Sequence, residues 1–267
     1  MNHSIKEQFA KARDQNRAAF IPFLSGGYPH RQTFLSLLRL LDQNGADIIE
    51  VGIPFSDPLA DGPVIQRSSQ LALDAGVTPA EVLELLAQAR GDLDAALVVM
   101  TYWNPVLQMG VETFAHRANE AGVQGVIVPD LPVDEADDWR EVAVEYNLDT
   151  IFMVAPTTPE PRARAIAEAS RGFVYFVSMT GVTGSALTLE PEILAQIGRV
   201  RQMSDCPVAV GFGVSNAQQA QKLAPVADGV IVGSALMKML LNAETPEAAV
   251  TGMEAWAVDF RHGLERS

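Results

Sequence analysis

The sequence predicts an α/β protein of the (β/α)8 TIM-barrel class, on the evidence of two repeating patterns. Short runs rich in β-branched residues recur about every 25 to 30 residues, and amphipathic stretches with helical spacing lie between them. Continuous apolar strands that alternate with helices indicate a parallel sheet covered by helices. Eight such units suit a closed barrel of about 250 residues. The eight candidate strands lie at residues 18–25, 47–53, 95–102, 125–130, 149–155, 173–178, 207–213 and 228–234.

Helices are predicted wherever apolar residues recur every three or four positions between those strands. Clear examples are Phe34, Leu37, Leu38 and Leu41, and Val82, Leu85, Leu86 and Ala89. Two helices are additional to the repeat, at residues 2–15 and at about 246–263. No linker divides the chain, so we expect one domain over residues 1–267. The alternative is a doubly wound sheet, but the first strand lacks a G-x-G-x-x-G turn.

Composition narrows the class of partner. The 267-residue chain has a formal net charge of -14, which argues against nucleic acid or an anionic membrane as the main partner. Its one cysteine, Cys206, excludes an internal disulfide and fits a reducing compartment. No apolar run reaches the roughly 18 residues of a membrane span. Residues 1–16 lack the apolar region of a secretory signal, so we expect a cytoplasmic protein.

A carboxylate interrupts the second candidate strand, DIIEVGI. Alternation along the strand puts Ile49, Val51 and Ile53 on one face. Glu50 then points into the barrel near the end where active sites of this fold form, and Gly52 is expected to leave open space above it. Burial raises the pKa of a carboxyl group toward the range useful for acid/base catalysis. The alternative is a glutamate satisfied by neighbouring hydroxyl or amide groups.

The loop after that strand, PFSDPLADGP, adds two further acids, Asp57 and Asp61. Its three prolines restrict the backbone and predict a shaped loop that folds back over the barrel mouth. There Asp61 can accept a hydrogen bond from a substrate N–H. The alternative is that both aspartates only form turns.

Two glycine turns follow the last two strands. One passes through Gly213 to a helix start at Ser215 and Asn216, and the other passes through Gly233 and Ser234. Glycines let a ligand approach the backbone, and helix N-termini present free N–H groups. Phosphate commonly binds at this part of a TIM barrel, so the pair predicts a phosphate site. The alternative is tight turn geometry alone.

The sixth unit, VYFVSMTGVTGSALTLEP, contributes a tyrosine and a loop of small polar residues. Such a loop is suited to closing over a substrate. Gly184 is placed to add a backbone donor near the phosphate, and Tyr175 is expected to project inward beside Glu50. A tyrosine that only fills the core is the alternative.

Apolar residues at inward positions of other strands predict a slot for a flat hydrophobic group, with ordinary barrel core as the alternative. They are Phe23, Met100, Tyr102, Met153 and Phe212. Asp130 ends the fourth strand and is expected to hold a loop rather than a substrate. The four histidines show no metal-binding spacing, so we expect no metal site.

Taken together, these motifs resemble the α subunits of tryptophan synthase over essentially the whole chain. The matching stretches are ADIIEVGIPFSDPLADGPVIQ, PDLPVDE, FVYFVSMTGVTG, GFGVS and DGVIVGSA, the first being long and highly specific. The resemblance implies cleavage of indole-3-glycerol phosphate to indole and glyceraldehyde 3-phosphate, without a cofactor. It also implies a partner, the pyridoxal-phosphate β subunit, in an α2β2 heterotetramer.

Position by position, the resemblance implies a role for each matching residue. The catalytic glutamate and aspartate of the family fall on Glu50 and Asp61, and a tyrosine of the same site falls on Tyr175. The phosphate-binding positions fall on Gly184, Gly213, Gly233 and Ser234, the indole slot on Phe23, Met100, Met153 and Phe212, and a segment facing the β subunit on Asp57 and Pro58. Some members carry an arginine where this chain has Met179, so an ion pair made by that arginine has no counterpart here.

The implied chemistry agrees with the side chains. Glu50 is expected to protonate indole C3 and then to act as base toward the side-chain hydroxyl, while Asp61 accepts from the indole N–H. Two alternatives are a lyase that acts without a partner and a non-catalytic phosphate-binding barrel. The presence of both acids argues against the second.

Overall fold

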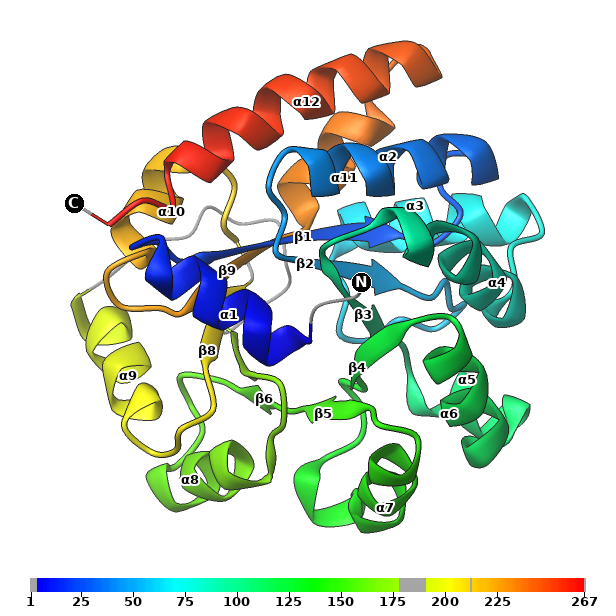
Figure 1. Ribbon diagram of the computed structural model, residues 1–267. Coiled ribbons are helices and arrows are strands. Elements are labelled where there is room, and N and C mark those ends of the chain that lie inside the picture. Colours follow the sequence, from blue (N-terminus) through cyan, green and yellow to red (C-terminus); the bar gives the residue numbers. More distant parts are fainter. Residues whose placement is uncertain (1–3, 178–190, 212, 267) are drawn as a thin grey trace.

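A parallel β-barrel forms the centre of the computed structural model, which describes residues 4–177, 191–211 and 213–266 (Figure 1). Its strands are β1 (Ala19–Ser25), β2 (Ile48–Gly52), β3 (Ala96–Met100), β4 (Val123–Ile127), β5 (Asp149–Ile151), β6 (Met153–Val154), β7 (Val174–Val177), β8 (Val208–Gly211) and β9 (Gly229–Val232). They pair in the order β5-β4-β3-β2-β1-β9-β8-β7-β6. The outer two, β5 and β6, are separated along the chain by Phe152 alone, so the barrel is closed except at that residue. The predicted fold class is confirmed.

A ring of helices covers the outside of the barrel (Figure 1). They are α1 (Ile5–Asp14), α2 (Arg31–Gln43), α3 (Pro63–Asp74), α4 (Pro79–Ala89), α5 (Trp103–Met109), α6 (Val111–Glu120), α7 (Asp137–Glu145), α8 (Glu160–Ala169), α9 (Pro191–Arg201), α10 (Ala217–Leu223), α11 (Ser234–Leu241) and α12 (Pro246–His262), with 3-10 turns at Arg90–Asp92 and Val133–Glu135. Their apolar stripes face the strands, as in α2, where the side chains of Phe34, Leu37, Leu38 and Leu41 are fully buried. Across the described ranges, no helix has both the length and the apolar character that crossing a bilayer requires.

Both additional helices are present, as α1 and α12, but two units carry a helix pair that the sequence patterns did not separate. Helices α5 and α6 are divided at Gly110, whose φ of 88° lies in the left-handed region. Helices α3 and α4 are divided at Gly76, with a φ of 78°, and the Thr78 side chain caps the second helix of that pair. Strand β4 begins at Val123, two residues before the expected start.

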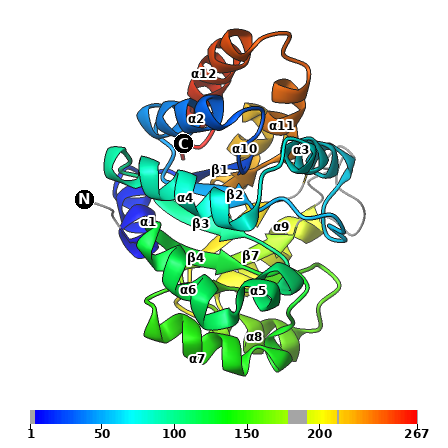
Figure 2. The same ribbon diagram turned by 90° about the vertical axis from the view of Figure 1, so that its right-hand side faces the viewer.

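The two ends of the barrel are covered differently. Helix α1 lies across the end where the strands begin, as the side view of Figure 2 shows at left, and buries Ile5 and Phe9 against it. A capping box between Ser4 and Glu7 fixes the start of α1. At the opposite end the strands run out into the loops that carry the predicted catalytic residues.

Candidate active site

A small cavity lies at the carboxyl ends of the strands, and predicted site residues from six strand units meet in its wall. Glu50, Asp61 and Tyr175 supply the acidic groups, and Gly213, Gly233 and Ser234 supply the glycine turns. The free space inside is about 30 Å³.

Glu50 is buried in the middle of β2, with 2% of its surface exposed. Register places it beside Phe23 of β1 and Val98 of β3, so strand alternation turns its side chain into the barrel as predicted. Among the described residues, none forms a hydrogen bond with its Oε2 atom, so the alternative of a fully satisfied structural glutamate does not describe this side chain. Burial, followed by the negative charge of Asp61, raises the pKa of Glu50 to about 8. At neutral pH this carboxyl group holds a proton.

Asp61 is also buried, at the end of the loop between β2 and α3. Burial raises the pKa of Asp61 to about 6, against the opposing effect of a hydrogen bond with Tyr102. The Tyr102 hydroxyl also accepts the N–H of Ala60 at 3.0 Å, and its ring packs on Phe55 with centroids 5.3 Å apart. Tyr102 thus holds the acid-bearing loop from the neighbouring strand unit.

Tyr175 of β7 completes the acidic group, and the prediction that it projects inward beside Glu50 agrees with the cavity wall. Burial, then the charges of Glu50 and Asp61, raise the pKa of its phenol, so it remains protonated. A Cβ on Gly211 of β8 would collide with the Tyr175 hydroxyl, so this glycine makes room for the ring.

The predicted phosphate site takes shape at the last two strand units. Gly213 has a φ of 82°, a left-handed conformation that glycine adopts without strain. Gly233 is the N-cap of α11, which begins at Ser234, so free N–H groups of the first helical turn lie at the cavity. The other helix start is at α10, where Asn216 accepts the N–H of Gln219 at 2.9 Å.

The predicted hydrophobic slot is only partly assembled. Phe23 and Met100 line the cavity, whereas Met153 and Tyr102 do not. The expectation of open space above Gly52 was wrong, because the Phe23 ring fills it and a Cβ there would lie 2.5 Å from Phe23 Cζ. Phe212, Gly184 and Met179 lie outside the described residues.

Three apolar lining residues were missed: Ile65, Val214 and Ile231. Ile231 was within reach of the alternation argument, because it lies two residues before Gly233 on β9 and shares its face. Ile65 comes from the first turn of α3, which no strand pattern places at the barrel mouth.

The loop between Glu50 and Asp61 also presents an apolar tip to solvent. Leu59 is 91% exposed, and beside it Asp57 is exposed and Pro58 half-buried. The Ser56 hydroxyl and the Asp57 carboxylate lie 2.5 Å apart. Asp130, expected to hold a loop, accepts the N–H of Trp103 at 2.9 Å and so fixes the start of α5.

Residues 9–264 match the sequence model of a family described as "Tryptophan synthase alpha chain". This chain belongs to the tryptophan synthase alpha chain family. Alpha chains similar to it include those of Carboxydothermus hydrogenoformans, 47% identical over 89% of each chain, and of a Picosynechococcus strain, 40% identical over 98% of this chain and 99% of the relative.

Solved structures of tryptophan synthase agree with the family. The barrel matches a Mycobacterium tuberculosis tryptophan synthase chain with a TM-score of 0.89 at 41% identity, over the full length of both chains. It matches the alpha subunit from Legionella pneumophila with a TM-score of 0.88 at 34% identity, over 98% of each chain. Tryptophan synthase alpha chains are lyases that cleave indole-3-glycerol phosphate in tryptophan biosynthesis, and this chain is one of them.

Proposed function

We propose that this alpha chain cleaves indole-3-glycerol phosphate with Glu50 as acid and base and Asp61 as the partner of the indole ring. The observation that carries the assignment is the buried Glu50 carboxyl group, whose Oε2 has no partner and which shares a cavity with Asp61. Since its pKa is raised to about 8, the group enters the reaction with a proton to give.

Proton transfer from Glu50 to indole C3 starts the cleavage and leaves a positively charged indolenine-like ring. The Glu50 carboxylate then removes the proton of the side-chain hydroxyl next to C3. The electrons of that O–H bond form the aldehyde carbonyl, the carbon–carbon bond breaks, and its electron pair returns to the ring as indole. Glu50 ends the cycle with the proton it began with.

Asp61 stabilises the charged ring by accepting the indole N–H. Its pKa of about 6 keeps it ionised at neutral pH, while Glu50 with its pKa of about 8 is not. Two carboxyl groups of one cavity thus take opposite protonation states, as their two roles require. The attraction to Asp61 grows as charge develops on the ring, so it lowers the barrier more than it strengthens binding.

The phosphate of the substrate is proposed to bind at Gly213, Gly233 and Ser234, with Gly184 as a further donor. The N-terminus of α11 supports this, because its free N–H groups and positive dipole end face the cavity. Tyr175 is proposed as a further catalytic-site residue beside Glu50. Phe23 and Met100 are proposed to contact the ring, and Met153, Tyr102 and Phe212 stay predictions for that slot. Binding the remote phosphate holds C3 in register with Glu50.

The proposed partner is the β subunit of tryptophan synthase, in an α2β2 heterotetramer that contacts the loop of Asp57 and Pro58. The solved relatives carry the name tryptophan synthase, and Leu59 at the loop tip is the most exposed of the large hydrophobic side chains in the described ranges. An apolar tip set among polar neighbours is typical of a protein contact. The same loop ends in Asp61, so partner binding and catalysis share one segment.

One domain over residues 1–267 and a cytoplasmic location stay predictions. Pairing of β1 with β9, near the two ends of the chain, supports the single domain. Limited proteolysis tests the single domain, and cellular fractionation tests the location.

The deciding experiment is a lyase assay on the purified chain, alone and with a β subunit, combined with size-exclusion chromatography of the mixture. We expect slow indole release alone, a large rate gain on mixing and co-elution. Full activity without the β subunit would instead support the lyase that acts alone. For the contact itself, Leu59→Asp should weaken co-elution. The matched control is Val258→Asp on α12, a valine that is 44% exposed away from this loop, and it should leave co-elution unchanged.

A further inference from the structure

A second cavity, larger than the first, lies at the end of the barrel where the strands begin. Its volume is about 420 Å³, within the range typical of small-molecule sites. The wall is built by α1, by the turns that precede β7 and β8, and by the segment after α12. None of its residues belongs to the active-site cavity.

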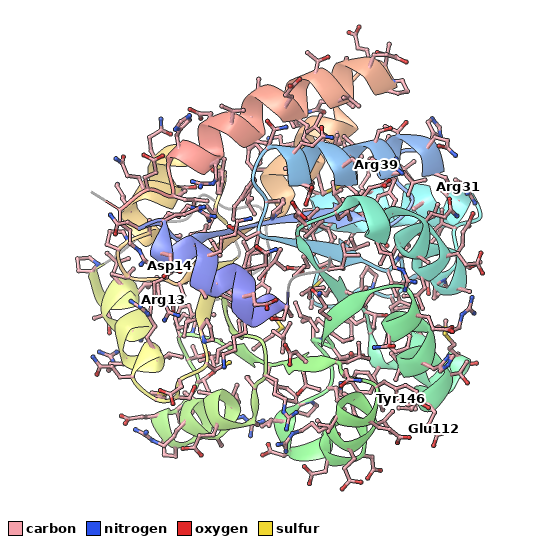
Figure 3. All side chains as sticks on the ribbon, viewed as in Figure 1. Arg13, Asp14, Arg31, Arg39, Glu112 and Tyr146 are labelled. Atoms are coloured by element: carbon pink, nitrogen blue, oxygen red, sulfur yellow. The ribbon has the colours of Figure 1, made fainter. Side chains whose placement is uncertain are left out.

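Basic side chains without ion-pair partners dominate this wall. Lys6, Phe9 and Arg13 come from one face of α1, spaced three and four residues apart, and Arg171 comes from the turn before β7. Figure 3 labels Arg13 on the side of α1 that faces α9. Within the part of the chain that the structure describes, neither the two arginines nor Lys6 makes a salt bridge or a side-chain hydrogen bond.

Arg266 adds a fourth cation that is held in place. Its Nε and Nη2 atoms donate to the carbonyls of Ala224 and Ala227 at 2.8 and 2.9 Å, and its backbone N–H donates to Asn16 at 3.0 Å. The two carbonyls are neutral and bring no counter-charge to the guanidinium, on which the charge of Asp228 acts. Burial, together with the charges of Arg201 and Arg13, lowers the pKa of Arg266 against the effect of Asp228.

The acids of the cavity do not balance these cations. Asp228 is already paired with Arg201 at 2.7 Å, and the fifth cation of the wall, Arg17, is paired with Asp47. Among the described residues that line the cavity, five cations therefore outnumber three acids, Asp149, Asp205 and Asp228. This excess of positive charge lies in a chain whose formal net charge is -14.

The turn that carries Arg171 is fixed by its backbone. The Arg171 N–H donates to the Thr150 carbonyl at 2.9 Å, and Gly172 has a φ of 75°. A Cβ on Gly172 would lie 3.1 Å from Asp149, so the turn sits tightly against β5. The backbone that carries Arg171 is therefore fixed against β5.

We propose that this cavity binds a small anion with two or more negative charges on phosphate or carboxylate oxygens. Such a ligand accepts hydrogen bonds from Lys6, Arg13 and Arg171 and from the unused Nη1 of Arg266. The apolar edge of Phe9 and the Pro207 ring complete the wall beside the charged groups.

Titration of the full chain with pyrophosphate at low salt, followed by residue-resolved NMR, tests the proposal. We expect saturable shifts of the backbone amides of Gly172, Cys206 and Arg266, weakened by added salt. The double variant Arg13→Gln, Arg171→Gln should raise the Kd at this site about tenfold or more. Pyrophosphate that also reaches the active site is recognised by separate shifts at Gly233 and Ser234.

A matched pair of substitutions controls for net charge. Arg39→Gln with Arg162→Gln removes the same charge from exposed arginines that pair with Asp92 and Asp134 away from the cavity. Figure 3 places Arg39 on α2, on the outer ring. This pair should leave the Kd within about twofold. Equal weakening by both pairs, shifts only at Gly233 and Ser234, or no saturation by about 10 mM would each overturn the proposal.

Discussion

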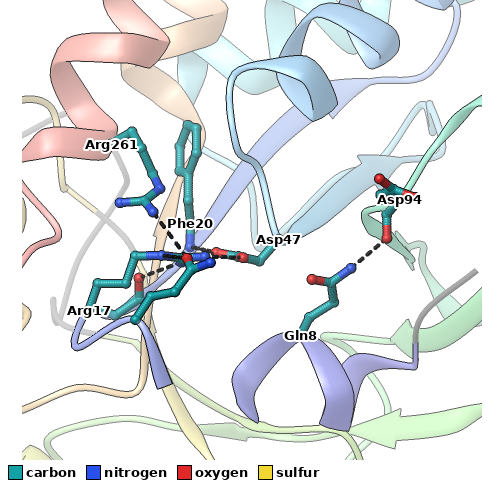
Figure 4. Close-up of polar contacts among 8 residues, drawn as sticks. Gln8, Arg17, Phe20, Asp47, Asp94 and Arg261 are labelled. Carbon is teal, nitrogen blue, oxygen red and sulfur yellow. Dashed lines mark hydrogen bonds and ion pairs between the residues drawn. The ribbon is translucent and has the colours of Figure 1, made fainter. Parts of the chain in front are cut away.

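Two buried acids three residues apart, Asp47 and Glu50, have opposite surroundings. Asp47, just before β2, accepts hydrogen bonds from both terminal nitrogens of Arg17, at 2.7 Å from Nη2, and from the N–H of Phe20 at 2.8 Å (Figure 4). Glu50, further along β2, has an oxygen without a hydrogen-bond partner in the described part of the chain. The relative exposures are 1% and 2%, so burial alone does not distinguish the two acids.

The difference between Asp47 and Glu50 lies in their hydrogen-bond partners. At the start of the strands, the charge of Asp47 joins the Arg17 segment to β1 and so contributes to stability. Further along the strand, burial without a compensating partner, together with the charge of Asp61, raises the pKa of Glu50 and leaves it protonated at neutral pH and able to transfer that proton. A structural carboxylate thus precedes β2 and a reactive carboxyl group lies within it, on the side of the active-site end, the division usual for this fold.

The largest expected effect is on activity, in Glu50→Gln. The variant cannot transfer the proton to C3, so kcat should fall by about 10⁴-fold, the upper range for one acid/base group. Binding of indolepropanol phosphate, a non-cleavable analogue, should stay nearly intact. Single-turnover indole release and analogue titration measure the two quantities. Appreciable turnover in this variant would remove Glu50 from the acid/base role.

The same variant should be stabilised relative to the parent chain at high pH. Folding raises the pKa of Glu50 from 4.5 to about 8, so its contribution to stability is complete below pH 4.5 and is lost as pH rises through 8. Glutamine does not ionise, so urea unfolding at pH 9 relative to pH 5 should favour the variant by about 2 to 4 kcal/mol. A parallel pH dependence in both proteins would contradict the raised pKa.

Asp47→Asn should destabilise the protein and leave its activity nearly unchanged. Neutralising this acid leaves the buried Arg17 without a counter-charge, and the free energy of unfolding at pH 7 should fall by about 3 to 5 kcal/mol. Lyase activity per folded molecule should stay within a few-fold. Asp92→Asn, which breaks the exposed pair with Arg39, is the matched control and should cost less than about 1 kcal/mol. Equal losses in the two variants would remove the distinction drawn for Asp47.

Sequence patterns were sufficient for the barrel and for the inward orientation of Glu50, because both depend on local periodicity. Alternation alone turned Glu50 inward, and the glycine turns alone marked Gly213 and Gly233. What they missed depends on packing between distant segments. Filling of the space above Gly52 by Phe23 requires the β1–β2 register, and the bond from Tyr102 to the Asp61 loop joins two strand units. Neither follows from the residues next to it in the chain.

The next largest effect is expected on ligand affinity, from substitution of Gly213 at the proposed phosphate site. Gly213→Asp places a negative side chain beside the proposed phosphate and a Cβ at a φ of 82°. We expect the affinity for indolepropanol phosphate to fall about 100-fold. Gly213→Asn imposes a similar backbone cost without the charge and should lose about tenfold or less. Equal losses would show that strain, not charge, weakens binding.

The two acids of the cavity also predict a bell-shaped pH profile. Glu50 must carry its proton, so kcat/KM should fall as pH rises above about 8. Asp61 must be ionised, so kcat/KM should fall as pH drops below about 6. Steady-state indole release between pH 5 and 10 measures both limbs. A profile that is flat across this range would contradict the assignment of roles.

The smallest effect should come from Tyr102→Phe, which tests whether the neighbouring strand unit tunes Asp61. Loss of the hydroxyl removes the hydrogen bond that lowers the pKa of Asp61, so the acid limb should move to higher pH. The Ala60 N–H also loses its acceptor, and kcat/KM at the optimum should fall about tenfold. Tyr146 is the C-cap of α7, and its ring packs on His116 of α6 (Figure 3). Tyr146→Phe therefore changes the same group without contact to the site and should leave the limb in place. If Tyr102→Phe lowers activity but leaves the acid limb of the pH profile in place, Tyr102 only holds the loop. The pKa of Asp61 is then set by burial and not by Tyr102.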